Sequence, residues 1–464
     1  MSPARDSSRS SSGLSRPSRF TWHVATCLVA VLVAPGVASA QCTDTFNASF
    51  VPAGGTFPGP GEGTPYQHLF PLGVGSSLNA LVSTMNTVNT AFLSPSSSFV
   101  SARGDASPDQ LGGGVWGRIA AGWVDSKAVT SGSVDTSKAR FTDFDGSPAP
   151  VPPVTGKGTC SGSLHEQYFG YQFGFDLAKL NVGSNGGNVH VGLTAGYFSS
   201  RSSDETADLL FTHASETPAH TLYSPPGSFD ADIQVPFLGV YTAYTQGNFF
   251  FDAQVRHDLY LMKFTDPLNG LSGQSQNATG ISAGANVGYK IPLAANWFIE
   301  PSGGMMWSRV RVDSITTPGS ATFQFLNAGA VHIDDIESIL GRVSLRAGTT
   351  INAGDVIWQP FGTATIFHEF ADEATATSRI GGPENGASCA AFPDSCPPSG
   401  FFLNQYRNLA LNTSTSRIGT YTQFGVGTAT VFGNSGWIAY GRADYKTGDN
   451  VEGFNFNAGV RYHW

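Results

Sequence analysis

Charged side chains are scarce in this chain. Of its 464 residues, 25 are Lys or Arg and 34 are Asp or Glu, so charged residues make up only 13% and the net charge is −9. An ordinary globular domain carries roughly 25% charged residues, so this composition is poorly suited to a water-exposed surface. The sequence has no block of Lys or Arg, which argues against nucleic acid as a partner, because neutralising phosphates requires clustered cations.

Long apolar runs are also missing beyond residue 40. A membrane-spanning helix needs about 20 apolar residues, and the mean hydropathy is only −0.08, so a helical membrane protein is excluded. A membrane barrel is not, because its strands alternate between lipid-facing and lumen-facing residues. The chain is rich in what such strands and their turns use, with 56 Gly residues and 12% aromatic residues.

The first 40 residues have the composition of an export signal. Four arginines precede an apolar run at residues 24–34, and Ala38-Ser39-Ala40 follows. This order predicts a signal peptide cut before Gln41. A permanent membrane anchor is the weaker alternative, because the apolar run is shorter than the roughly 20 residues of a span.

The cysteines fit an oxidising compartment. Cys27 would leave with the signal peptide, and an even number of four remains. Cys389 and Cys396 enclose a short loop that contains proline, which predicts a local disulfide. Cys42 and Cys160 then pair by elimination.

One helix is predicted before the β region. Residues 41–75 are rich in Gly, Pro and Thr without any period and predict loop. Ser76 and Ser77 are candidate N-caps and Pro95 is a stop signal, so the helix is expected near 77–93. It would be about 24 Å long, close to the height of the apolar band of a membrane barrel. Its apolar stripe consists of Leu78, Leu81, Val82, Met85, Val88 and Phe92.

From about Val115 onward the hydrophobic pattern changes to period two. At the C-terminus Phe454, Phe456 and Val460 alternate with polar residues. A β-sandwich strand could show the same alternation, but here long charged side chains occupy the polar face. In a barrel filled by a helix these charges would pair with one another and with the helix, whereas in an open pore they would line water. The predicted lumen-facing residues are Arg118, Asp252, Arg256, Asp258, Arg442 and Arg461.

Turn signals divide this region into about twelve segments. Short connections alternate with long ones near 126–164, 200–230, 314–336 and 372–415, as in outer-membrane barrels, where short turns face the periplasm and long loops the exterior. The predicted fold is therefore all-β, a closed antiparallel transmembrane β-barrel of about twelve strands. The segments lie near 115–125, 165–177, 187–199, 231–245, 248–264, 276–290, 296–313, 337–351, 356–371, 416–432, 436–446 and 452–464.

Tryptophans recur at one end of the predicted strands. Indole rings prefer the level of the lipid headgroups, so this placement predicts an aromatic girdle on the periplasmic side. Its members are Trp116, Trp297, Trp358, Trp437 and Trp464.

Residues 110–464 resemble the β-domain of autotransporters, the type V secretion translocators. The matching motifs include Val115-Trp116-Gly117-Arg118, the stretch 170–176 (GYQFGFD) and the closing Val460-Arg461-Tyr462-His463-Trp464. The resemblance implies a twelve-stranded barrel with the helix at 77–93 threaded through its pore. It also implies that the final aromatic strand, with Val460, Tyr462 and Trp464, is recognised by the barrel-assembly machinery.

Together these predictions divide the chain into a signal peptide (1–40), a short exported segment with the pore helix (41–108) and an outer-membrane barrel (109–464). Autotransporters usually carry a long passenger, but here only residues 41 to about 75 precede the helix. The expected function is a barrel in the Gram-negative outer membrane that moves this segment through its lumen and displays long loops. The alternatives are a surface adhesion module that binds through its loops and an open porin-like channel. The expected partners are outer-membrane lipids, the assembly machinery and an unknown surface partner, and the chain is expected to be a monomer.

No catalytic motif is present. The sequence lacks G-x-S-x-G, H-E-x-x-H, a phosphate-binding glycine loop and paired C-x-x-C. His332, Asp334, Asp335 and Glu337 could hold Ca²⁺, although a solvated loop edge is the favoured interpretation. We therefore expect no enzyme activity, no cofactor and no metal.

Overall fold

The computed structural model describes residues 41–44, 47–48, 70–92, 106–142, 148–151, 154–155, 157–206, 210–213, 221–223, 227–266, 271–318, 328–380 and 406–464. The chain divides into the units Met1–Val37 and Ala38–Trp464, and all the described residues belong to the second. The predicted signal peptide and the predicted Cys389–Cys396 disulfide lie outside them.

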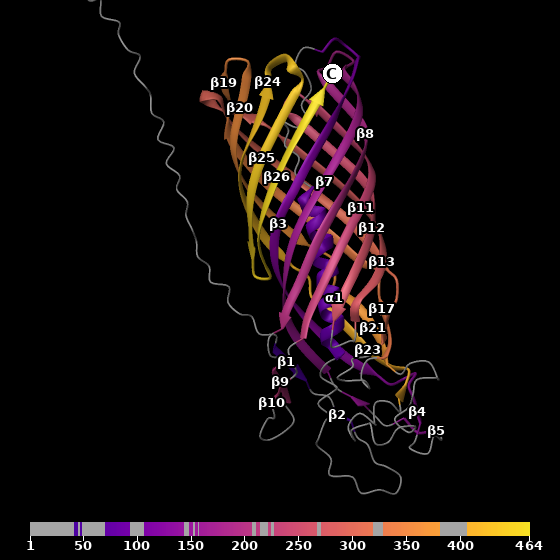
Figure 1. The fold of residues 1–464 in the computed structure, drawn as a ribbon. Coiled ribbons are helices and arrows are strands. Elements are labelled where there is room, and N and C mark those ends of the chain that lie inside the picture. Colours follow the sequence, from indigo (N-terminus) through magenta and orange to yellow (C-terminus); the bar gives the residue numbers. More distant parts are fainter. Residues whose placement is uncertain are drawn as a thin grey trace, which may run out of the picture. The chain divides into compact units, whose positions relative to one another are not determined.

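Twelve long strands form a closed antiparallel ring (Figure 1). The ring closes where β26 pairs with β3, from Val451 opposite Ser126 to His463 opposite Gly114. Each of the twelve predicted segments overlaps one ring strand, so the predicted fold is confirmed. In order these strands are β3 (Gln110–Asp135), β7 (Lys157–Val182), β8 (Gly187–Thr206), β11 (Gly227–Gln246), β12 (Phe249–Asp266), β13 (Leu271–Tyr289), β15 (Trp297–Val312), β18 (Ile336–Thr349), β20 (Val356–Glu369), β24 (Thr420–Phe432), β25 (Trp437–Gly448) and β26 (Val451–His463).

The two ends of the ring differ in how the strands are connected. At the end that carries Trp464, which we call the short-turn end, the connections are tight, as between Gln246 and Phe249. Gly247 in that turn has φ 57, a left-handed conformation that glycine adopts without steric cost. Other short elements here are β14 (Ile291–Pro292), η3 (Ala294–Asn296), β19 (Ile351–Ala353) and η6 (Gly433–Ser435).

At the opposite end, which we call the long-loop end, the sheet continues past the β25–β26 turn. There the end of β3 pairs with β23, with Thr130 opposite Thr415 and Asp135 opposite Ala410. The long connections and the N-terminal stretch 41–75, which were predicted as loops, are therefore partly strands. Their polar, Ser- and Thr-rich sequences lack the apolar alternation that marks a strand. The added elements are β1 (Gln41–Asp44), β2 (Asn47–Ala48), β4 (Arg140–Thr142), β5 (Pro148–Ala149), β6 (Val154–Thr155), β9 (Leu210–His213), β10 (Thr221–Tyr223), β16 (Ile315–Pro318), β17 (Ala328–Ile333), β21 (Ala374–Ile380), β22 (Tyr406–Arg407) and β23 (Leu409–Thr415).

Helix α1 (Phe70–Ala91) lies inside the barrel (Figure 1). It begins at Phe70 rather than near Ser77, so the predicted N-cap is wrong. The whole span 77–92 is buried except Thr90, which means that the barrel covers the polar face of the helix as well as its apolar stripe. In the described part of the chain, no helix is both long and apolar enough to cross a membrane.

Candidate functional site: the lumen and its helix

The strands present opposite faces to the lumen and to the outside. On β26 the outward side chains of Phe454, Phe456 and Val460 are 41–49% exposed, while Asn457 and Arg461 on the inner face are 1% and 3% exposed. This alternation agrees with the period-two pattern of the sequence. The lumen is therefore lined by every second residue of each strand.

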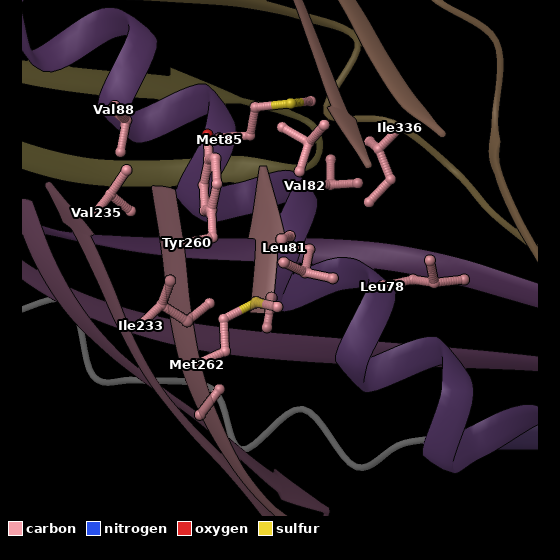
Figure 2. Packing of buried hydrophobic residues seen from close by; sticks show 14 of the residues in the cluster. Leu78, Leu81, Val82, Met85, Val88, Ile233, Val235, Tyr260, Met262 and Ile336 are labelled. Atoms are coloured by element: carbon pink, nitrogen blue, oxygen red, sulfur yellow. The ribbon is translucent and has the colours of Figure 1, made fainter. Parts of the chain in front are cut away.

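Towards the long-loop end the lumen is apolar. Successive inward positions of β12 there are Tyr260, Met262 and Phe264, and all three are buried. They belong to one hydrophobic cluster with residues from other strands and from α1. Figure 2 shows Leu78, Leu81, Val82, Met85 and Val88 of the helix packed among Ile233, Val235, Tyr260, Met262 and Ile336. The expectation of a polar lumen is wrong for this region, which we call the apolar half.

The polar face of the helix is held by one carboxylate. Glu166 on β7 is completely buried and accepts hydrogen bonds from the hydroxyls of Ser83 at 2.6 Å, Thr87 at 3.1 Å and Thr84 at 3.2 Å. A buried polar group that lost these partners would be left unsatisfied at a cost of about 1–3 kcal/mol. Three hydroxyls within little more than one turn of the helix therefore fix its height and rotation against β7.

Near its C-terminal end the helix meets the charged part of the lumen. Asn89 donates from Nδ2 to the Ser308 hydroxyl at 2.9 Å and accepts at Oδ1 from Arg256 at 3.2 Å. Lys446 donates to the Thr90 hydroxyl at 3.1 Å, and the side chain of Asn457 donates to the Ala91 carbonyl at 2.7 Å. The helix end is thus bonded to several strands.

From the C-terminal end of the helix towards the short-turn end, the lumen is filled with ion pairs. We call this region the polar half. Arg256 bonds Asp258 at 2.5 Å and lies over the Phe237 ring at 4.8 Å. Arg346 bonds Glu300 at 3.2 Å, and Arg442 bonds Asp444 at 2.7 Å. Isolated buried charges are very costly and paired ones much less so, so the arrangement suits a lumen with little water.

The six residues predicted to line the lumen all lie inside the barrel. Besides the pairs above, Arg118 bonds Gln172 at 2.8 Å and lies 5.4 Å from the Phe92 ring centroid, and Asp252 accepts from Asn286 at 2.8 Å. Sequence reasoning missed several partners that share the lumen, although the same alternation of positions could have found them. They are Glu166, Asp176, Glu300, Arg342, Arg346 and Asp444.

A connected network ties the closing strand to its neighbours. Arg461 on β26 bonds both carboxylate oxygens of Asp176 on β7, at 2.8 and 2.9 Å. Asp176 also contacts His190 Nδ1 at 2.8 Å and accepts from the Tyr241 hydroxyl at 2.7 Å. Trp116 on β3 donates to that same hydroxyl at 2.6 Å. The network joins five strands around the closure of the ring.

Trp116 therefore does not belong to an outward girdle, and that prediction is wrong. Its indole is 8% exposed and lies in the lumen, whereas its neighbour Val115 is 44% exposed. Gly174 on the adjacent strand makes room for it, because a Cβ there would overlap the indole ring. The position of Trp116 at a strand end suggested an outward indole, whereas the alternation of β3 places the indole in the lumen.

Comparison of the sequence with protein-family models identifies the family of this barrel. The model of the autotransporter beta-domain matches residues 155–390, about half of the chain. The chain belongs to the autotransporter β-domain family. This family places the protein in the outer membrane of Gram-negative bacteria and in type V secretion, and its β-domains are translocators rather than enzymes themselves.

The chain is also similar to solved structures of autotransporter barrels. The transport unit of the autotransporter AIDA-I from Escherichia coli is 12% identical with a TM-score of 0.52, over 83% of this chain and 98% of that one. The β-domain of the Bordetella autotransporter BrkA is 17% identical with a TM-score of 0.45, over 75% and 98%. The translocator domain of NalP from Neisseria meningitidis is 12% identical with a TM-score of 0.40, over 83% and 96%. No curated protein matches the chain.

Four of the predicted girdle tryptophans lie on the outside of this autotransporter β-domain. Trp297, Trp358, Trp437 and Trp464 are 44–54% exposed and lie at the short-turn end. Trp437 and Trp464 both pack against Tyr462, with ring centroids 5.1 and 6.3 Å apart. Such amphipathic rings suit the boundary between lipid and water.

A second set of outward aromatics, which sequence reasoning missed, lies further towards the long-loop end. Trp123 stacks on His165 with ring centroids 6.2 Å apart, and the indole of Trp307 donates to Glu337 at 2.6 Å. Each indole contacts a polar side chain, His165 or Glu337, as expected for an aromatic ring at a membrane boundary. The alternation of β3 predicts that Trp123 points outward, because it lies on the same face of the strand as Val115.

The acidic cluster near residue 335 is occupied by protein partners. Asp335 bonds Arg309 and Arg311, and the Thr375 hydroxyl donates to Asp334 at 2.5 Å. Hydrogen bonds from Arg311 and Arg309 lower the pKa of Asp335. Among the described residues, no group of three His, Cys, Asp or Glu side chains could hold a metal ion. The cluster is best explained as a set of ion pairs at the rim.

Proposed function

We propose that this autotransporter β-domain moves its own N-terminal segment through its lumen and then keeps α1 there as a plug. In this proposal the signal peptide is cut before Gln41, the long-loop end faces the cell exterior and the short-turn end faces the periplasm. The exported cargo is the short stretch before the helix. The barrel then remains at the surface with its loops displayed.

The main support for this proposal is that the chain enters the barrel at one end and leaves it at the other. At the long-loop end of β7, β1 pairs with residues 158–161, with Asp44 opposite Gly158. At the other end of β7, the backbone N–H of Asp109 donates to the Asn181 carbonyl at 3.1 Å. Residues on the two sides of α1 therefore lie at opposite ends of one strand, with the helix in the lumen between them.

A closed ring restricts how this arrangement can form. Since the sheet has no free edge in the ring, the segment must pass along the lumen or be enclosed as the last strand pairs with the first. The family is one of translocators, which favours passage along the lumen. The hydrogen bonds of Glu166 with the helix, and those of the helix residue Asn89 with Ser308 and Arg256, then explain why movement stops with α1 inside.

Conductance in planar bilayers tests the plug. Because α1 fills the apolar half and also bonds Arg256 and Lys446 in the charged part, we expect little current from the intact protein and an increase after deletion of residues 76–95. A point variant, Met85→Asp, should raise the opening frequency without shortening the chain, because it places a charge in the hydrophobic cluster. Phe424→Leu on the lipid-facing surface is a matched control that should behave like the parent.

The same recordings distinguish the alternative function. An open porin-like channel would conduct at full level with the helix intact, and the deletion would add nothing. Protease treatment of intact cells tests the orientation, since cuts should fall in the long connections. Cuts confined to the short turns would show that the barrel is oriented the other way.

A further inference from the structure

We propose that Cys42 and Cys160 form a disulfide that fixes the exported N-terminal segment as an extra strand of the barrel mouth. On this view the segment before α1 is a permanent part of the barrel rather than a passenger to be released. The inference rests on the proposed function for its location at the cell surface, but not for the pairing of the two cysteines.

The first support is the position of β1 in the sheet. It pairs antiparallel with β7, where Cys42 is the Cα partner of Cys160. On its other side it pairs parallel with β9, from Gln41 opposite Leu210 to Asp44 opposite His213. β1 therefore lies between two strands (Figure 1), so that backbone groups on both of its edges find partners.

The second support is the edge that β1 covers. The ladder of β7 with β8 begins at His165, opposite Ser203, and continues towards the short-turn end. Residues 157–164 of β7 extend beyond it, and β1 occupies part of that edge. An uncovered strand edge is a template for pairing with other chains, and addition of a strand to such an edge is a common mode of peptide binding. The N-terminal segment thus completes its own barrel.

The third support is the state of Cys160. Its side chain is 3% exposed on the inner face of β7, and the residue is disulfide-bonded. Residues directly opposite on antiparallel strands have Cα atoms about 4.5–5.5 Å apart, which is within the range of about 4.4–6.8 Å that a disulfide needs. Cys42 is the residue in that position.

The chemistry is a two-electron oxidation. The two thiols lose two protons and two electrons and form one S–S bond. The oxidant is a disulfide-bonded thiol oxidoreductase of the exported compartment, whose own disulfide is reduced to two thiols.

Peptide mapping of the full chain from outer membranes tests the pairing. After free thiols are alkylated, trypsin should give residues 41–103 linked to residues 158–179, because no Lys or Arg lies inside either stretch. The linked peptide should vanish on reduction and in Cys42→Ser. The double variant Cys389→Ser/Cys396→Ser is the control and should retain it. Alkylation of both Cys42 and Cys160 without reduction, or linkage of either to another cysteine, would overturn the pairing.

Labelling of intact cells separates this inference from the proposed function. A membrane-impermeant reductant followed by an impermeant maleimide should label both cysteines without lysis. Linked cysteines that react only after lysis would support the pairing but contradict the surface location. Unlinked cysteines on a surface-exposed segment would contradict the pairing and leave the direction of export standing.

The retention role has its own test. A protease site inserted between Gly54 and Gly55 would free the fragment 41–54 unless the disulfide holds it. Treated cells of the parent should retain the fragment until reductant is added, while Cys42→Ser should release it at once. Equal release from both would show that the bond, if present, does not hold the segment.

Discussion

The two halves of the lumen are filled in different ways. In the apolar half, a helix is buried among hydrophobic side chains of the strands. In the polar half, charged side chains of the strands neutralise one another in pairs such as Arg346 with Glu300. The first arrangement needs the helix to cover the strand surface, and the second is mostly complete within the strands. The comparison indicates that the strands specify one half, while the strands and the helix together specify the other.

Breaking an ion pair of the polar half should have the largest effect. Arg256→Met removes the partner of Asp258, and both side chains are at most 2% exposed. The uncompensated carboxylate should lower the free energy of unfolding by about 3–5 kcal/mol. Urea unfolding in detergent micelles, followed by tryptophan fluorescence, measures it.

The double variant Arg256→Met/Asp258→Leu is the control for that prediction. Replacing both members of a buried pair by apolar residues is often close to neutral, so stability should return towards the parent. A double variant as unstable as the single one would mean that the pair contributes by more than neutralising charge, for example through the bond from Arg256 to Asn89.

Truncating the helix tests the apolar half. Leu81 is 1% exposed within the hydrophobic cluster, and Leu81→Ala should cost about 2–5 kcal/mol through lost burial and the cavity left behind. The same unfolding assay applies. Leu193→Ala, at an outward position with 60% exposure, is the matched control and should cost much less. Equal losses from the two variants would contradict the docking of α1.

The smallest effect is expected at the helix face that binds Glu166. Ser83→Ala removes one of three hydroxyl donors to that carboxylate and should cost about 1 kcal/mol. A double-mutant cycle with Glu166→Gln isolates the interaction between the two side chains. A coupling energy of zero would show that the carboxylate does not hold the helix at this height.

The ring strands were predictable because alternation is a local property. On β12, Asp252, Arg256 and Asp258 interrupt an apolar pattern at every second residue, and this marks both the strand and its inner face. The alternation is lost on β11, where Ile233 and Val235 point inward but Leu238 and Val240 point outward. Both faces are apolar there, since one meets the helix and the other the lipid. The hydrophobic pattern of that strand alone therefore could not predict an apolar lumen.

The candidate site was predictable only where it depends on local sequence patterns. The apolar stripe of α1 follows from its spacing, and the charged lumen residues follow from the strands. The start of the helix at Phe70 does not follow, because the helix continues through Ser76 and Ser77, the residues that the sequence offers as N-caps. The alternation of β3 already places Trp116 on the inner face, but its contacts with Gly174 and Tyr241 of other strands do not follow from the sequence of β3.

By itself the sequence determined a closed sheet with lipid outside and charges inside, because each strand records its two environments in alternate residues. Only the tertiary structure decided which lumen residues meet the helix, which aspartate binds Arg461 and where Gln41–Asp44 pair. These features depend on contacts between residues far apart in the chain. The hydrophobic pattern of a single strand does not indicate which distant residues it contacts.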